Sequence, residues 1–286
     1  MRIKKFELSD YDSVINFLIE LNKEAPATIN WNWARFEWML GHPATDLSLI
    51  NSIGLWFDCN KLVGLVTYDM YYGEASVLVL PKYQELYHEI LQYAYDVMKD
   101  DLGVAIFDNN NYQINEALKL GFHKTESVEN IMYFDLDNDL NIDFKNGISF
   151  KEIDPKDDYD DFGFLMWQGF NHGNNYEEYI NSDDAKLSDF IRPNFKKELS
   201  LVALDNQKYV AYCSLWFKEG TDYAYLEPVC CIPEYRMKGI TKALIFEGFR
   251  RAKQMGAKTI YVESDMEFYK KLGFKHQYHY DFYWKK

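Results

Sequence analysis

The stretch EPVCCIPEYRMKGITKALI, residues 227–245, holds the strongest structural signal in the chain. An apolar run ends at a proline, three charged residues surround a glycine, and a helical apolar pattern follows. This order predicts a strand that enters a helix through a short turn. A helix N-terminus leaves N–H groups unpaired and carries partial positive charge from the helix dipole. The turn therefore predicts a binding site for an anion, most often a phosphate.

The composition of the turn strengthens this prediction. Gly239 permits close approach of the backbone to a ligand. Full positive charges come from Arg236, Lys238 and Lys242. The backbone groups expected to face the anion are those of Met237, Gly239, Ile240 and Thr241. The P-loop and GxGxxG patterns are absent, which argues against a nucleoside triphosphate.

Four pairs of similar segments recur in the same order along the chain, which predicts an internal repeat. The first three pairs are IKKFEL (3–8) with ISFKEI (148–153), KLVGLV (61–66) with KYVAYC (208–213), and SVLVLPKY (76–83) with PVCCIPEY (228–235). The tetrapeptide KLGF then occurs at 119–122 and at 271–274. The offset grows from 145 to 152 residues, as loop insertions in the second copy would produce.

Each half is predicted to contain the same series of strands and helices. Strands are expected at 2–8, 52–58, 61–70, 103–107 and 130–136, and at 148–153, 199–205, 208–218, 258–263 and 276–284, with a further strand in each half ending at the proline. Helices are expected at 11–24, 32–40 and 84–99, and at 157–171, 176–191 and 238–255. We therefore predict an α/β (α+β) fold with a mixed sheet, used twice. The predicted domains are 1–140 and 148–286, joined by a polar linker at 141–147.

Bulk properties exclude several classes of protein. The net charge of −14 argues against a nucleic-acid partner. No apolar run approaches the length of a membrane span, and no signal peptide is recognisable, so we predict a cytoplasmic protein. The four cysteines lack CxxC spacing and are expected to be reduced structural thiols. The histidines have no metal-like spacing, so no metal site is predicted.

At the turn, VCCIPEYRMKGITKALI resembles the acyl-CoA signature of the GNAT superfamily of N-acetyltransferases. That signature has Arg or Gln, two residues, Gly, one residue, and Gly or Ala; Arg236, Gly239 and Thr241 fill these positions. Thr241 departs from the usual Gly or Ala, so its side chain must turn away from the phosphates. FYKKLGF (268–274) is similar to a second motif of the family. An asparagine that often precedes this motif is replaced by Val262, and Ser264 is a candidate substitute for it.

The resemblance implies acetyl-CoA as co-substrate and a role for each matched residue. Backbone groups of Val229 and Cys231 would bind the pantetheine arm on a splayed strand. N–H groups of 237–241 would bind the pyrophosphate. Tyr269 would be the general acid for the departing thiolate, although a core tyrosine is the alternative. Glu227 would relay the proton of the amine, directly or through water, although a plain surface carboxylate is the alternative.

The first half lacks all of these features. At an offset of 152 residues, Tyr269 corresponds to Ala117, and Gly239 corresponds to Tyr87. We therefore predict a degenerate first half that keeps the fold without binding acetyl-CoA. Residues 1–146 hold 23 acidic and 11 basic residues, a balance of −12. This charge favours a cationic acceptor, although acidic surfaces also aid solubility.

The leading hypothesis is a tandem GNAT N-acetyltransferase that moves an acetyl group directly from acetyl-CoA to an amine. The acceptor would be a small molecule or a peptide, and the protein would be a monomer or homodimer. Two alternatives remain open. One is a non-catalytic acyl-CoA sensor module, and the other is a transferase of a larger acyl or aminoacyl group.

Overall fold

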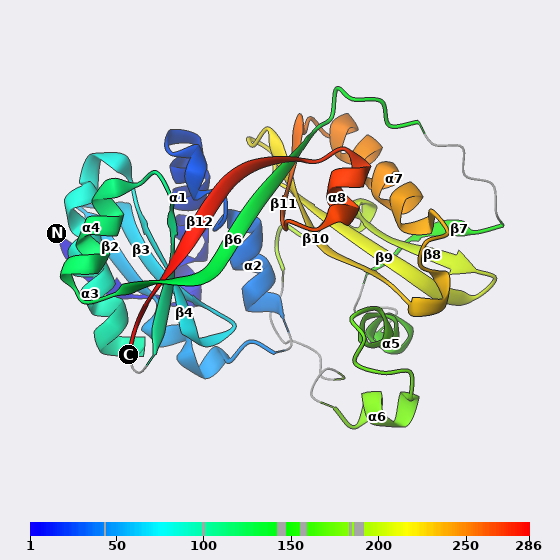
Figure 1. Cartoon of the computed structure of the whole chain (residues 1–286), viewed down its shortest axis with the longest axis horizontal. Helices are drawn as coiled ribbons and strands as arrows, with labels where there is room; N and C mark the ends of the chain where they lie inside the picture. Colours follow the sequence, from blue (N-terminus) through cyan, green and yellow to red (C-terminus); the bar gives the residue numbers. More distant parts are fainter. Residues whose placement is uncertain (43, 99–100, 142–146, 155–158, 183–184, 186–191) are drawn as a thin grey trace. The chain divides into compact units, whose positions relative to one another are not determined.

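The computed structural model describes residues 1–286 except 43, 99–100, 142–146, 155–158, 183–184 and 186–191 (Figure 1). Contacts between residues divide the chain into two compact units. Unit 1 comprises Met1–Ile131, Glu263–Asp265 and His276–Lys286, and unit 2 comprises Met132–Val262 and Met266–Lys275. Both units combine helices with parallel and antiparallel strand pairs, which confirms the predicted α/β class with a mixed sheet.

Unit 1 is built on the strand order β1-β2-β3-β4-β5-β12-β6. Its strands are β1 (Arg2–Lys5), β2 (Gly54–Asp58), β3 (Lys61–Asp69), β4 (Tyr71–Val79), β5 (Leu102–Phe107) and parts of β6 (His123–Asp135) and β12 (Lys275–Lys285). Its α-helices are α1 (Tyr11–Glu24), α2 (Trp33–Gly41), α3 (Tyr87–Met98) and α4 (Asn111–Lys119). Apolar residues of α1 at helical spacing, such as Val14, Leu18 and Leu21, are fully buried and hold the helix on the sheet.

Unit 2 follows the order β6-β11-β10-β9-β8-β7. Its strands are β7 (Ser149–Glu152), β8 (Ser200–Asp205), β9 (Lys208–Phe217), β10 (Tyr223–Cys231) and β11 (Thr259–Glu263). Its α-helices are α5 (Tyr159–Gly169), α6 (Tyr176–Ile180), α7 (Ile240–Gln254) and α8 (Glu267–Leu272). The helix predicted at 176–191 is seen only as the short α6, and residues 183–184 and 186–191 lie outside the described residues.

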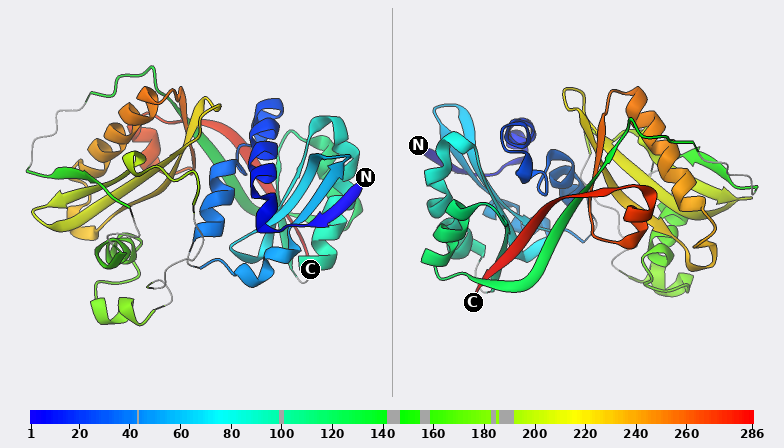
Figure 2. Two further views of the ribbon diagram at one scale, coloured as in Figure 1. Left: turned by 180° about the vertical axis from the view of Figure 1, so that it is seen from behind. Right: turned by 45° about the horizontal axis from the view of Figure 1, so that its top comes forward.

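The core of unit 2 lies between its sheet and two helices. Strand β9 is buried along nearly its whole length, because α7 packs on one face of the sheet and α5 on the other (Figures 1 and 2). The apolar stripe of α7 is fully covered, with Leu244 and Phe249 at 0 % exposure. Phe134 packs against Phe249 and Phe274 at ring distances of 5.0 and 5.5 Å, so the second KLGF segment anchors this core.

The two halves share local geometry at the segments that the predicted repeat pairs. After each proline, a tyrosine hydroxyl donates to an aspartate at the end of a neighbouring strand: Tyr83 to Asp58 at 2.7 Å and Tyr235 to Asp205 at 2.7 Å. Both KLGF glycines have positive φ, as helix C-terminal glycines do. The N–H of the following phenylalanine then bonds back to the helix in each half, to Ala117 and to Tyr269 respectively.

The last strand of the sequence joins unit 1. Strand β12 pairs antiparallel with β5, from Tyr280 opposite Phe107 to Lys285 opposite Leu102, and it runs beside β6 (Figures 1 and 2). The predicted domains were 1–140 and 148–286, whereas the compact units place 276–286 with the first half and 132–140 with the second. Of the predicted linker 141–147, residues 142–146 lie outside the described residues. The strand partner of β12 is set by contacts more than 150 residues away, which no local pattern encodes.

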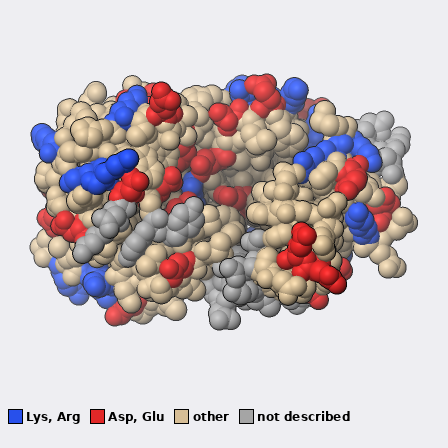
Figure 3. Space-filling view, turned by 60° about the horizontal axis from the view of Figure 1, so that its bottom comes forward, with Lys and Arg blue, Asp and Glu red and all other residues tan. Residues whose placement is uncertain are grey.

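All four cysteines are unpaired, and only Cys59 is exposed. Among the described residues, no helix has the length and apolar character needed to cross a membrane. Acidic and basic side chains are interspersed on the face shown in Figure 3.

Candidate functional site

Strand β10 leaves its parallel neighbour before it ends. It pairs with β11 at Tyr223–Tyr225, whereas its pairing with β9 continues to Cys231 after an irregularity between Leu226 and Val229. The predicted backbone ligands, Val229 and Cys231, therefore lie beyond the last pair with β11. This geometry is the splay that the sequence resemblance implies.

The turn between β10 and α7 has an unusual backbone. Met237 and Gly239 both have positive φ, of 61° and 79°. Gly239 is the N-cap of α7, and no side chain caps the helix. Residues 236–239 are exposed, and a Cβ built on Gly239 would meet nothing within 4 Å. The first N–H groups of a 15-residue helix therefore remain available to an anion at the surface.

Arg236 has a supporting position in this arrangement. Its Nε donates to the carbonyl oxygen of Cys231 at 2.9 Å, and its Nη2 donates to Gly169 O at 2.9 Å and Asn171 Oδ1 at 2.8 Å. The guanidinium thus ties the turn to the end of β10 and to the end of α5. A contact of Arg236 with the cofactor stays a prediction.

The remaining residues of the turn divide between backbone and side-chain roles. Lys238 lies over the Tyr235 ring at 4.6 Å, and Lys242 lies over the Phe246 ring at 5.3 Å. Burial raises the pKa of the Cys231 thiol, and a hydrogen bond with Thr241 opposes that effect. The side chain of Thr241 is therefore occupied by Cys231, and its N–H remains at the helix terminus beside that of Ile240.

Tyr269 lies on α8 and packs edge-to-face on Phe268 and Phe274. Burial raises the pKa of its hydroxyl, and the nearby Cys213 thiol and Glu227 carboxylate raise it further. The hydroxyl is therefore protonated at neutral pH, as a general acid must be. The structure also brings the two predicted catalytic side chains, Tyr269 and Glu227, within electrostatic reach of each other.

Ser264 differs from the other predicted residues because it belongs to unit 1. Its N–H donates to the carbonyl oxygen of Asn130 at 2.9 Å. His276 and His279 also contact Asn130, through its Oδ1 at 3.3 and 2.8 Å. In the described part of the chain, no group of three or more His, Cys, Asp or Glu side chains is arranged to hold a metal ion.

The corresponding position in unit 1 has a different geometry. Tyr87, the equivalent of Gly239, has α-helical φ and ψ and is 2 % exposed. Glu89, the equivalent of Thr241, accepts a bond from Trp56 Nε1 at 2.7 Å. The helix therefore continues from the preceding 3₁₀ turn (Pro81–Leu86) without the open turn of unit 2.

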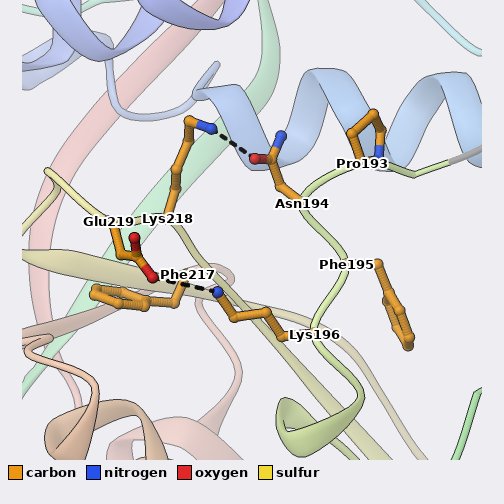
Figure 4. A pocket seen from close by; sticks show the side chains of 7 residues that line it. All are labelled: Pro193, Asn194, Phe195, Lys196, Phe217, Lys218 and Glu219. Carbon is orange, nitrogen blue, oxygen red and sulfur yellow. Dashed lines mark hydrogen bonds and ion pairs between the residues drawn. The ribbon is translucent and has the colours of Figure 1, made fainter.

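A surface pocket of unit 2 was not foreseen from the sequence. Figure 4 shows its lining from the segment before β8 and from the end of β9, and its volume is about 280 Å³. Lys218 donates to Asn194 Oδ1 at 2.6 Å, and Lys196 lies 3.9 Å from Glu219. None of the predicted site residues lines it. Two separate segments, residues 193–196 and 217–219, form it, so no single motif marked it.

Residues 164–274 match the model of the acetyltransferase (GNAT) family, a range that contains the turn and Tyr269. A tandem GNAT protein from the clavulanic acid biosynthesis pathway has a similar fold, with a TM-score of 0.63, 12 % identity, and coverage of 99 % of this chain and 98 % of that one. A GCN5-related N-acetyltransferase from Sphaerobacter thermophilus is similar with a TM-score of 0.60 and 14 % identity, and the match covers 99 % of this chain and 95 % of that one. The C-terminal domain of a putative lysylphosphatidylglycerol synthetase from Agrobacterium fabrum is similar with a TM-score of 0.56 and 10 % identity, and the match covers 97 % of this chain and 92 % of that one.

No curated protein matches the sequence. At these identities the structural likeness shows a common fold, and together with the family match it supports acyl transfer as the general activity. Residues 164–274 therefore match the acetyltransferase (GNAT) family, and over nearly its whole length the chain is similar in fold to a tandem GNAT protein.

Proposed function

We propose that this protein is an N-acetyltransferase that moves an acetyl group from acetyl-CoA directly to an amine, with one working site in unit 2. The observation that carries the proposal is the uncapped start of α7 behind a turn with positive φ at Met237 and Gly239. N–H groups that converge at a helix N-terminus bind phosphates well. The diphosphate of coenzyme A is the matching ligand for a GNAT domain.

The end of β10 would hold the pantetheine arm. Beyond Tyr225 the strand has left β11, so the backbone of Val229 and Cys231 is placed to pair with an extended ligand in place of a strand. The Cys231 N–H would also donate to the thioester oxygen as negative charge develops there. The buried Cys231 thiol, whose pKa is raised, would take no covalent part.

The proposed chemistry uses two side chains of unit 2. The bound co-substrate supplies an activated acetyl group. The nitrogen lone pair of the amine forms a bond to the carbonyl carbon, and the carbon–sulfur bond breaks. Tyr269 gives its proton to the departing sulfur, and Glu227 accepts the proton that the amine loses, directly or through water. The raised pKa of Tyr269 supports the first role, because the hydroxyl keeps its proton at neutral pH.

Replacement of Tyr269 by phenylalanine tests the reaction. Tyr269→Phe should lower turnover about 100-fold or more, the usual contribution of a positioned acid, with coenzyme A affinity nearly unchanged. Tyr133→Phe, which changes a half-buried tyrosine on β6, is the control and should keep full turnover. Turnover is measured as thiol release with a panel of amines. Normal turnover of Tyr269→Phe would remove this residue from the mechanism.

Calorimetric titration with coenzyme A tests the number of sites. We expect one site per chain, because Tyr87 fills the position of the open turn in unit 1. Two equivalent sites per chain would contradict a degenerate first half.

A transferase of a larger acyl or aminoacyl group is the second candidate. It is favoured by the fold shared with the putative lysylphosphatidylglycerol synthetase domain. A comparison of acyl-CoA donors of increasing chain length separates the two, since an acetyltransferase should lose turnover as the chain grows. Binding of coenzyme A without turnover on any amine would instead indicate a sensor module.

We further propose a cationic amine as acceptor and a cytoplasmic location. The first proposal rests on the −12 balance of residues 1–146. The second rests on the four unpaired cysteines, which a reducing compartment would maintain.

A further inference from the structure

Four carboxylates of unit 1 gather around a single arginine. Arg35 on α2 contacts Asp69 Oδ2 at 2.8 Å, at the end of β3, and forms an ion pair with Glu263, at the end of β11. Its guanidinium also lies over the Trp31 ring at 4.9 Å. Glu129 on β6 and Glu74 on β4 lie within electrostatic reach of Arg35 and Asp69. We call these residues the acidic cluster: Arg35, Asp69, Glu74, Glu129 and Glu263.

The charge of the acidic cluster is unbalanced. Four carboxylates and one guanidinium give −3 when all are ionised. The other ion pairs of unit 1 are more nearly matched, as in Lys61 with Glu20 or Lys124 with Asp281. Like charges held together on a partly buried surface repel one another strongly. Burial raises the pKa of Glu129 and of Glu74, so a bound cation would favour their ionised forms and up to three positive charges would balance the cluster.

Glu129 is the most informative member. It is 8 % exposed, and its Oε1 is buried with no hydrogen-bond partner. Its carboxyl group lies within electrostatic reach of Arg35, Asp69 and Glu74, which all act on its pKa, and its side chain also bonds with Asn30. Asp69 Oδ1 is a second buried oxygen without a partner. A buried carboxylate oxygen left unpaired costs free energy, so each native example calls for an explanation, of which a bound cation is one.

The arrangement favours an organic cation. Within the described residues, no three acidic side chains converge as metal ligands do. An ammonium group has three donors that reach separate acceptors, and a chain with several such groups spans separated carboxylates. A single ammonium would leave −2 at the cluster, whereas a polyamine would neutralise it.

We propose that the acidic cluster is a binding site for an organic cation with two or more ammonium groups, of the polyamine class. Glu129 Oε1 and Asp69 Oδ1 accept bonds from one ammonium group, and Glu74 and Glu263 neutralise the rest of the chain. This binding requires no acyl transfer, so it is independent of the proposed function.

Calorimetry of the full chain with spermidine tests the site. The wild type should bind one spermidine saturably, and Glu129→Gln should weaken binding about tenfold or more, since a bond to a charged group is lost. Glu126→Gln is the matched control: it removes the same charge from an exposed position on the same strand, and it should change affinity less than about twofold. Thermal melting checks that each variant is folded. Asp69→Asn, with the same expectation, replaces Glu129→Gln if the latter does not fold.

Three outcomes would overturn the proposal. The first is the absence of saturable spermidine binding by the wild type. The second is an equal loss of affinity in Glu129→Gln and Glu126→Gln, which would mean that the acidic surface as a whole attracts the polyamine. The third is displacement of spermidine by about 1 mM Mg²⁺ at constant ionic strength, which would assign the cluster to a metal ion.

Discussion

The buried Glu129 should make the stability of this protein fall as pH rises, and Glu129→Gln should abolish that fall. Burial raises the pKa of Glu129 from 4.5 to about 7, with Asp69 and Glu74 raising it further and with Arg35 and Asn30 opposing the effect. The folded protein therefore holds this proton more tightly than the unfolded chain does. The stabilisation is fully present below pH 4.5 and is lost as pH rises towards 7.

The size of the effect follows from the two pKa values. At 1.36 kcal/mol per pH unit, the difference between them corresponds to about 3 kcal/mol. Because part of the cost is already present at pH 5, the wild type should lose about 2 to 3 kcal/mol relative to Glu129→Gln between pH 5 and pH 8.5. The glutamine keeps the shape of the side chain and cannot ionise, so the variant should be the more stable protein at pH 8.5.

Urea denaturation followed by tryptophan fluorescence at several pH values measures this difference. Glu126→Gln controls for the change in net charge and should run parallel to the wild type. Saturating spermidine should restore wild-type stability at pH 8.5 and leave Glu129→Gln almost unaffected. If the curves of wild type and Glu129→Gln stay parallel from pH 5 to 8.5, Glu129 does not carry a buried charge and the reasoning fails.

Three further predictions concern the turn of unit 2, the thiols and the packing of β12 on β5. Gly239→Ala should weaken coenzyme A binding at least tenfold and cost ~1 kcal/mol of stability. Gly220→Ala is the control: Gly220 has a similar positive φ and equally open surroundings, so this change should cost a similar amount of stability and leave the affinity intact. Equal affinities of the two variants would place the phosphates elsewhere. Iodoacetamide should modify one thiol of the native protein rapidly, Cys59, because the other three are buried and their pKa values are raised; a second fast thiol would show that a buried one opens. Gly103→Ala should destabilise unit 1 by about 1 to 3 kcal/mol, because a Cβ there would lie 2.5 Å from the Trp284 ring on β12. Urea denaturation measures this effect, and an unchanged stability would mean that β12 does not pack on β5.

The sequence predicted the parts of the site that depend on neighbours along the chain. The strand end at Cys231, the proline turn and the glycine before Ile240 follow one another within a dozen residues, and each acts through local sterics and hydrogen bonds. The repeat was equally visible, because equivalent prolines and KLGF glycines impose the same local geometry twice. The catalytic role of Tyr269 was predicted from its motif and stays a prediction.

Other features could not be predicted because they depend on distant contacts. The bonds of the Arg236 side chain to Gly169 and Asn171, which are more than 60 residues away, could not be predicted, and its contact with the cofactor stays a prediction. The pocket beside Lys218 is lined by two separate segments. Charge counts indicated an acidic first half but gave no sign that one carboxylate oxygen, Glu129 Oε1, is buried without a hydrogen-bond partner.

The sequence by itself thus determined the α/β class and the open turn before α7, because apolar period, proline and glycine act over a few residues. Tertiary structure alone decided that β12 pairs with β5 and that Asp69 and Glu263 contact Arg35. A strand pattern shows which face is buried but not which strand lies alongside. Pairing partners are chosen by the packing of the whole fold, and the clustered charges are a consequence of that choice.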